Sequence, residues 1–158
     1  MLYYAYAKTD EKNERDAARE LLFSLLKDKL DFHSECSLEH EGDGSPYLLG
    51  ENGSRLDGIY ISISHSGGFC AAAVSDTPVG IDIERIRSLS GRERSIERRF
   101  LSDVTLEKKH ADSEHSFFFK WTYAEAMFKC KDKTAPIRTH EIINDGGSLY
   151  VLCVVGKG

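Results

Sequence analysis

Hydrophobic and polar positions recur with two different spacings along the chain, and these spacings separate predicted strands from predicted helices. Leu2 to Ala7 is rich in tyrosine and apolar residues, which is typical of a strand. From Ala17 to Leu26 the apolar residues recur about every 3.6 positions, as on one face of a helix. Thr9 or Asp10 can cap that helix, which is expected to run to about Leu30. The chain is therefore predicted to open with a strand and a long helix.

The next stretch, from Asp31 to Asp57, has no clear period and is expected to be irregular. It carries strong turn signals from Gly42 to Pro46 and from Gly50 to Gly53.

Strand patterns return in the middle of the chain. Residues from Ile59 to Ser64 alternate apolar and polar, Phe69 to Val74 is a second strand, and Val79 to Ile83 is a third. Ser66 to Gly68 can turn the chain tightly between the first two, and Thr77-Pro78 ends the second.

The last third predicts helices followed by a hairpin. The arginine-rich segment from Arg85 to Lys109 is expected to form one or two helices, and Ser116 to Lys131 another. Strands are expected around Thr139 to Ile143 and Ser148 to Val155, joined by a turn at Asn144 to Gly147. This order of elements predicts an α+β fold in two similar halves, residues 1–76 and 77–158, within one compact unit.

Composition narrows the classes of protein that fit. The chain has 158 residues, 41% hydrophobic and 30% charged, which suits a globular protein of one domain. It has no run of 18 apolar residues and no signal-peptide pattern, so we expect no membrane span and a cytoplasmic location. The formal net charge of −5 argues against a general nucleic-acid binder. The four cysteines form no CxxC pair, so free thiols are expected rather than a zinc or redox site.

Two carboxylates lie at the end of the strand predicted from Val79 to Ile83. Residues two apart on a strand point to the same face, so Asp82 and Glu84 project together while Ile81 and Ile83 face the core. Hard oxygen ligands of this kind suit Mg²⁺ beside a phosphate. The alternative is an edge strand with a solvated acidic face, because such pairs are common.

A second candidate pair lies on the helix near residue 120. Glu125 and Lys129 are four residues apart and share one helix face. Glu125 can supply a third carboxylate to a metal and Lys129 can reach a phosphate oxygen. A surface ion pair explains the same spacing.

A histidine at a strand end completes the candidates. His65 precedes Gly67 and Gly68, whose turn can present backbone N–H groups to an anion. No nucleophile elbow accompanies it, so nucleophilic catalysis is not indicated. A hydrogen-bonded structural histidine is the alternative.

Taken together, these segments resemble a known family. The blocks Ser64–Gly68, Ala71–Asp76 and Pro78–Glu84 form one continuous signature. Trp121–Lys129 follows at the expected distance, and Arg98–Ser102 lies between the two. They resemble the phosphopantetheinyl transferase superfamily, in particular its pseudo-dimeric branch, which activates peptide and polyketide synthases and of which this chain would be a short variant.

The resemblance implies a fold and a metal site. In this family two α+β halves pack around one coenzyme A site. Asp82, Glu84 and Glu125 would hold Mg²⁺ against the pyrophosphate of coenzyme A, and Glu125 would help to deprotonate the attacking serine. Lys129 would contact a phosphate.

The resemblance also implies the reaction and its partners. Ser64 and His65 would bind the nucleotide end of coenzyme A, with His65 near the 3'-phosphate. A serine of an acyl or peptidyl carrier protein would attack the β-phosphate, and 3',5'-ADP would leave. A metal and a lysine offset the negative charge that crowds the phosphorus.

Two departures from the family pattern keep other functions open. Ser45 and Ala124 stand where the family usually has lysine. A non-catalytic protein that binds coenzyme A or a carrier is therefore the first alternative. A metal-dependent phosphodiesterase has less support, because no additional His/Asp cluster is visible in the sequence.

A basic segment follows the acidic strand and suggests how a carrier docks. Its arginines can steer the acidic helix of a carrier protein. Interleaved Glu93 and Glu97 fit an ordinary solvated helix face equally well. The arginines are Arg85, Arg87, Arg92, Arg94, Arg98 and Arg99.

Overall fold

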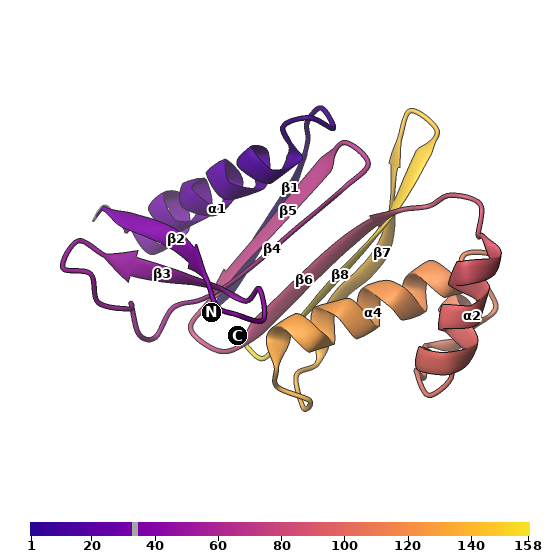
Figure 1. Ribbon diagram of the computed structural model, residues 1–158. Helices are drawn as coiled ribbons and strands as arrows, with labels where there is room; N and C mark the ends of the chain where they lie inside the picture. Colours follow the sequence, from indigo (N-terminus) through magenta and orange to yellow (C-terminus); the bar gives the residue numbers. More distant parts are fainter. Residues whose placement is uncertain (33–34) are drawn as a thin grey trace.

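The computed structural model describes residues 1–32 and 35–158, which form a mixed α/β fold of eight strands and four helices. Two antiparallel sheets of three strands and one separate hairpin are present (Figure 1). The first sheet has the order β1-β5-β4 and the second β6-β8-β7. Their strands are β1 (Leu2–Lys8), β4 (Tyr60–Ser66), β5 (Phe69–Ser75), β6 (Val79–Arg85), β7 (Ile137–Asp145) and β8 (Ser148–Gly156).

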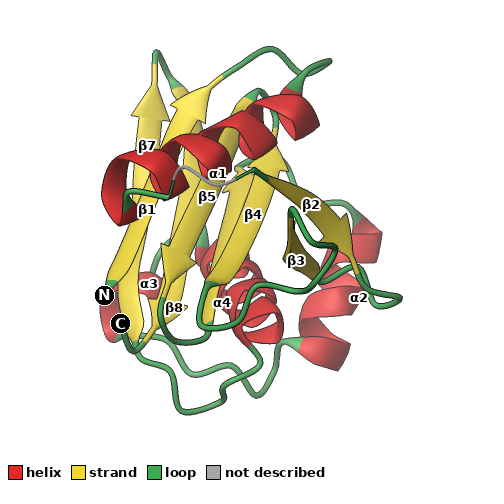
Figure 2. Ribbon diagram, turned by 90° about the vertical axis from the view of Figure 1, so that its left-hand side faces the viewer, coloured by secondary structure: helices red, strands yellow, loops and turns green. Residues whose placement is uncertain are grey.

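The two long helices lie on the outer faces of the two sheets. α1 covers the first sheet and α4 covers the second, and Figure 2 shows α1 lying across β5 and β4. Leu22 and Leu26 of α1 pack against Val74 of β5, while Ala126 of α4 packs against Val155 of β8. The helices are α1 (Glu14–Leu30), α2 (Gly91–Phe100), α3 (Lys108–Ala111) and α4 (Ser116–Cys130).

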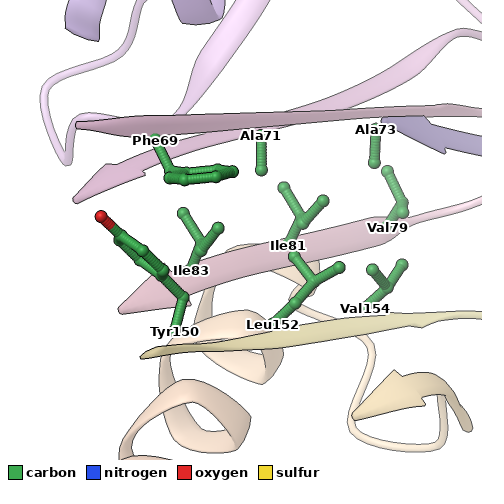
Figure 3. Close-up of a cluster of buried hydrophobic side chains, with 9 residues drawn as sticks. All are labelled: Phe69, Ala71, Ala73, Val79, Ile81, Ile83, Tyr150, Leu152 and Val154. Carbon is green, nitrogen blue, oxygen red and sulfur yellow. The ribbon is translucent and has the colours of Figure 1, made fainter. Parts of the chain in front are cut away.

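The main core lies between the two sheets. Alternate side chains of β5 point toward alternate side chains of β6 and β8, as Figure 3 shows. Small residues on β5 let the sheets approach, since Ala71 and Ala73 face Ile81 and Leu152 with no exposed surface. The prediction that Ile81 and Ile83 face the core is confirmed, because both are fully buried. The layers are therefore helix, sheet, sheet and helix.

The neighbouring edges of the two sheets are joined by side chains. Along β4, every second residue is a serine whose hydroxyl oxygen accepts a hydrogen bond from a backbone N–H of β6. We call this row the serine seam. Its pairs are Ser62 with Ile81 at 3.0 Å, Ser64 with Ile83 at 3.1 Å, and Ser66 with Arg85 at 3.0 Å.

A close contact fixes α4 against β6. A side-chain carbon at Gly80 would lie 1.8 Å from the backbone oxygen of Ala126. Only glycine fits there, so Gly80 sets the depth at which α4 sits on the second sheet.

Two sequence expectations are wrong. The first helix begins at Glu14, not after Thr9 or Asp10, because the Asp10 carboxylate accepts bonds from the N–H groups of Lys12 and Asn13 and holds a turn there. The stretch from 31 to 57 is not irregular, although its positions 33 and 34 lie outside the described residues. It contains the antiparallel hairpin β2 (Cys36–His40) and β3 (Pro46–Gly50).

The segment from Arg85 to Lys109 holds α2 and the start of α3, so much of it is not helical, and the remaining elements match their predictions to within a few residues. The turns at 66–68 and 144–147 are present, with Gly67, Gly68, Gly146 and Gly147 all at positive φ. Among the described residues, no helix combines the length and the apolar character needed to cross a membrane.

Candidate functional site

A cavity of about 630 Å³ opens where β4 and β6 meet. It lies between the two halves of the sequence, with walls from α1, β2, β4, β6 and α4. Positively charged, negatively charged and polar side chains line it. They are Arg15, Asp16, Arg19, His40, Ser64, His65, Asp82, Glu84 and Lys129.

Asp82 is the most deeply buried of these charges, with 4% of its surface exposed. Its Oδ1 accepts hydrogen bonds from Ser64 Oγ at 3.2 Å and from Lys129 Nζ at 3.1 Å. Its Oδ2 has no hydrogen-bond partner among the described residues. Burial raises the pKa of Asp82 to about 7, and the charges of Glu84 and Glu125 add to that rise while Lys129 opposes it. The possibility of a solvated acidic face is therefore excluded for Asp82.

Glu84 lies two residues further along β6 and is partly buried. Its Oε1 accepts a hydrogen bond from Trp121 Nε1 at 3.2 Å and its Oε2 accepts one from Ser66 Oγ at 3.3 Å. Burial raises the pKa of Glu84, and the bonds from Trp121 and Ser66 limit the rise. The carboxylate is thus fixed in orientation at the cavity wall.

Lys129 reaches from α4 across the edge of both sheets. Its Nζ donates to the backbone oxygens of Ile63 on β4 at 3.2 Å and Ile81 on β6 at 3.0 Å, as well as to Asp82. All three ammonium hydrogens are therefore engaged in this structure. The surface ion pair with Glu125 that we considered for Lys129 is not what the structure shows, because its partner is Asp82.

Glu125 lies one helical turn before Lys129 and is partly buried. Its charge adds to the effect of burial in raising the pKa of Asp82. Glu125 is not among the residues that line the 630 Å³ cavity. Within residues 1–32 and 35–158, no three His, Cys, Asp or Glu side chains are gathered closely enough to form a metal site.

The donor set nevertheless fits a hard cation. An acceptor atom of Asp82 is buried without a partner, and burial together with neighbouring carboxylates raises the pKa of Asp82. A divalent cation would satisfy both conditions, because Mg²⁺ takes one or two carboxylates together with phosphate oxygens and waters.

Ser64 and His65 differ in how much they offer a ligand. The Ser64 hydroxyl belongs to the serine seam and also donates to Asp82, and the residue is 8% exposed. The His65 side chain is 39% exposed, and its Nδ1 lies 2.9 Å from Oε2 of Glu14.

The cavity also contains residues to which the sequence gave little or no weight. Arg15 and Arg19 are one turn apart on α1, and nothing in their spacing in the sequence marks them as phosphate-binding residues. His40 comes from β2, in the stretch expected to be irregular. Glu14 belongs to none of the sequence motifs and was not predicted as a site residue.

Ser45 and Ala124, the two departures from the family pattern, lie outside the 630 Å³ cavity. Ser45 lines a second cavity of about 350 Å³, which shares Lys129 with the first. Ala124 packs against the cluster around Leu101 and Phe118.

The arginine-rich segment forms α2 and the loops beside it. Arg87 pairs with Glu93 at 2.6 Å, and its guanidinium carbon lies 5.5 Å from the centre of the Phe118 ring. Arg87, Arg92, Phe117 and Trp121 line a third cavity of about 290 Å³, on whose wall Glu84 also lies. The proposed docking of a carrier at this segment stays a prediction.

Comparison with known proteins gives a consistent picture. No protein-family model matches the chain. It is 34% identical over 131 residues to the 4'-phosphopantetheinyl transferase gsp of Aneurinibacillus migulanus, covering 77% of this chain and 51% of the relative. It is 33% identical over 99 residues to the 4'-phosphopantetheinyl transferase psf-1 of Bacillus pumilus, covering 60% and 39%. It is 33% identical over 81 residues to the 4'-phosphopantetheinyl transferase ffp of Bacillus subtilis, covering 49% and 35%. These matches span about half or less of each relative's length.

Proposed function

Because the chain belongs to the 4'-phosphopantetheinyl transferase superfamily, we propose that it transfers the 4'-phosphopantetheine group of coenzyme A to a serine of a carrier protein. The acceptor is an acyl or peptidyl carrier protein, Mg²⁺ is the cofactor, and 3',5'-ADP is released.

The observation that carries this proposal is the half-paired carboxylate of Asp82. A buried acceptor without a partner is unfavourable by about 1–3 kcal/mol and is retained where a ligand completes it. Here it lies on the wall of a cavity that also holds Lys129, Arg15 and Arg19. A metal-bound pyrophosphate is a ligand that presents a cation to the carboxylates and anionic oxygens to the basic groups.

The proposed metal ligands are Asp82, Glu84 and Glu125. When bound, Mg²⁺ would offset the negative charge on the pyrophosphate oxygens. This role is supported by the hydrogen bonds that fix the two β6 carboxylates, from Ser64 to Asp82 and from Ser66 and Trp121 to Glu84.

The other roles concern phosphate binding and the proton. Lys129 is proposed to leave the backbone oxygens that it now contacts and to donate to a phosphate oxygen. Glu125 is proposed to accept the proton of the carrier serine, directly or through water. Ser64 and His65 are proposed to hold the nucleotide end of coenzyme A, with His65 at the 3'-phosphate.

The fold and location are proposed in finer detail. We propose that the halves 1–76 and 77–158 form a pseudo-dimer, with the serine seam along their junction. All four cysteines are free, as expected in a reducing compartment, and the cytoplasm is the proposed location.

A non-catalytic binder of coenzyme A or of a carrier is the second candidate. Its support is that Ser45 and Ala124 stand where the family usually has lysine. This candidate predicts binding without turnover.

Mass spectrometry of intact carrier proteins distinguishes the two candidates. The chain is incubated with coenzyme A, MgCl₂ and a panel of apo-carriers, with Glu125→Ala and magnesium-free samples alongside. A carrier that gains one phosphopantetheine group, only with magnesium and with Glu125, supports the transferase. Binding of coenzyme A with no mass gain on any carrier supports the second candidate.

A further inference from the structure

Glu14 stands outside every motif in the sequence, yet it contacts the candidate nucleotide-binding residue His65. It is the first residue of α1, and only 14% of its side chain is exposed. A carboxylate at a helix N-terminus is favoured by the helix dipole, so the charge is stabilised in this position.

Both carboxylate oxygens of Glu14 are occupied by the turn between β4 and β5. Its Oε2 lies 2.9 Å from Nδ1 of His65, and its Oε1 accepts a hydrogen bond from the N–H of Gly68 at 2.6 Å. Because the two contacts come from both sides of the turn, they fix the side chain of Glu14 and the ring of His65 together.

The contact determines which ring nitrogen of His65 is available. A carboxylate can only accept a hydrogen bond, so the Nδ1 nitrogen of His65 that faces Glu14 must be the one that carries a hydrogen. No other described residue hydrogen-bonds the ring, which leaves Nε2 for a ligand. When the ring is doubly protonated, Nε2 is a charged donor and Glu14 supplies the balancing negative charge.

The surroundings identify the chemistry of that ligand. His65 lines the same cavity as Arg15 and Arg19, which follow Glu14 on α1. Two guanidinium groups beside an imidazole that can take up a second proton suit a terminal phosphate with two negative charges.

We propose that Glu14 is a positioning residue that holds His65 to recognise the terminal 3'-phosphate of the coenzyme A nucleotide. Glu14 acts through His65 and does not touch the substrate. The inference rests on the proposed function, since it takes coenzyme A as the ligand of this cavity.

A purely structural role for Glu14 is the competing explanation. The turn is also held by a 2.7 Å hydrogen bond from the N–H of Thr9 to the backbone oxygen of Gly68. Glu14 is therefore one of two groups that fix the turn. Glu14→Gln separates the two roles, because the amide oxygen can still accept from Gly68 while the charge opposite His65 is lost.

The test is calorimetric binding of coenzyme A and of 3'-dephospho-coenzyme A, with MgCl₂, to four proteins. These are the wild type, Glu14→Gln, His65→Ala and the double variant. We expect Glu14→Gln to weaken coenzyme A binding about tenfold, as for loss of one charge-assisted hydrogen bond, and to leave the dephospho compound within about twofold. In the His65→Ala background the same change should add little, which is the coupling expected of residues that act together. Glu20→Gln, an exposed change on the same helix, is the control.

Three outcomes overturn the inference. Equal loss for both ligands would make Glu14 structural, and undiminished preference for coenzyme A in Glu14→Gln would remove its role. A wild type that does not distinguish the two ligands would overturn the proposed nucleotide site as well. Should Glu14→Gln fail to fold, ¹⁵N NMR of the wild-type His65 ring still tests the inference, which requires a hydrogen on Nδ1.

Discussion

The ammonium nitrogen of Lys129 lies 3.1 Å from Oδ1 of Asp82, while Oδ2 of the same carboxylate has no partner among the described residues. The pair therefore compensates only part of a buried charge. Groups that bind ligands are often retained at the expense of stability, because their best partner is the ligand.

Asp82→Asn should stabilise the chain in metal-free buffer near pH 8. The pKa of Asp82 is raised to about 7, chiefly by burial. Between about pH 4 and 7 the folded chain keeps a proton that the unfolded chain has lost, so stability falls as pH rises and the loss is complete above 7. Removing this ionisation should raise the free energy of unfolding by about 2–4 kcal/mol, measured by urea denaturation.

The same variant should lose magnesium-dependent binding of coenzyme A. Asp57→Asn, an exposed change, should alter neither property. An Asp82→Asn protein that is less stable than wild type near pH 8 would show that the carboxylate is already well compensated.

Ser62→Ala should weaken the serine seam. The hydroxyl of Ser62 accepts the N–H of Ile81, and the two residues are 2% and 0% exposed. Alanine leaves that N–H buried without a partner, which should lower the free energy of unfolding by about 1–3 kcal/mol. Ser54→Ala, at an exposed position, should stay within about 0.5 kcal/mol of wild type. An unchanged urea midpoint for Ser62→Ala would argue against the seam.

Gly80→Ala should separate α4 from β6. The new carbon would meet the backbone of Ala126 at 1.8 Å and that of Cys130 at 2.9 Å, so the helix itself has to move. We expect a loss of about 3 kcal/mol or more in thermal or urea unfolding. Gly91→Ala is the matched control, because nothing lies within 4 Å of its added carbon. Equal behaviour of the two variants would contradict this packing.

His140 should make the chain sensitive to acid. It packs edge-on against Phe119 and shares a 3.1 Å hydrogen bond between its Nε2 and Thr122 Oγ1. Burial, with the charge of His110, lowers the pKa of His140 to about 4. As pH falls from about 6.5 to 4, His140 binds a proton in the unfolded chain but not in the folded chain. The free energy of unfolding therefore falls over that interval.

Urea midpoints at pH 7 and pH 5 test this. His140→Gln can keep a bond to Thr122 but cannot be protonated, so it should lose less stability than wild type between the two pH values. A wild type and variant with parallel losses would exclude His140 as the source.

The sequence predicted the parts of the fold and site that depend on local spacing. Alternation revealed β4, and the two-residue spacing of Asp82 and Glu84 placed both carboxylates on one face of β6. The hairpin of β2 and β3 was missed because each strand has five residues and turn signals surround them. Leu38 and Leu48 bury one side of the hairpin against the leucines of α1. This packing joins distant parts of the chain and cannot be predicted from local spacing.

Long-range partners could not be predicted. Glu14 and His65 are 51 residues apart, and nothing in the sequence around Glu14 distinguishes it from the other acids of the first helix. The contacts of Lys129 with two strand backbones likewise require the packing of α4 on β6. The candidate side chains could be picked out in the sequence, whereas most of the contacts that orient them could not.

The serine seam makes the joint between the two sheets depend on the identity of particular side chains. A ladder of backbone hydrogen bonds is made of atoms that every residue shares, so no single codon change removes one of its acceptors. Each rung of the seam depends instead on one hydroxyl, at Ser62, Ser64 or Ser66. Selection can therefore loosen or tighten this joint one residue at a time, while the sheets on either side keep their pairing.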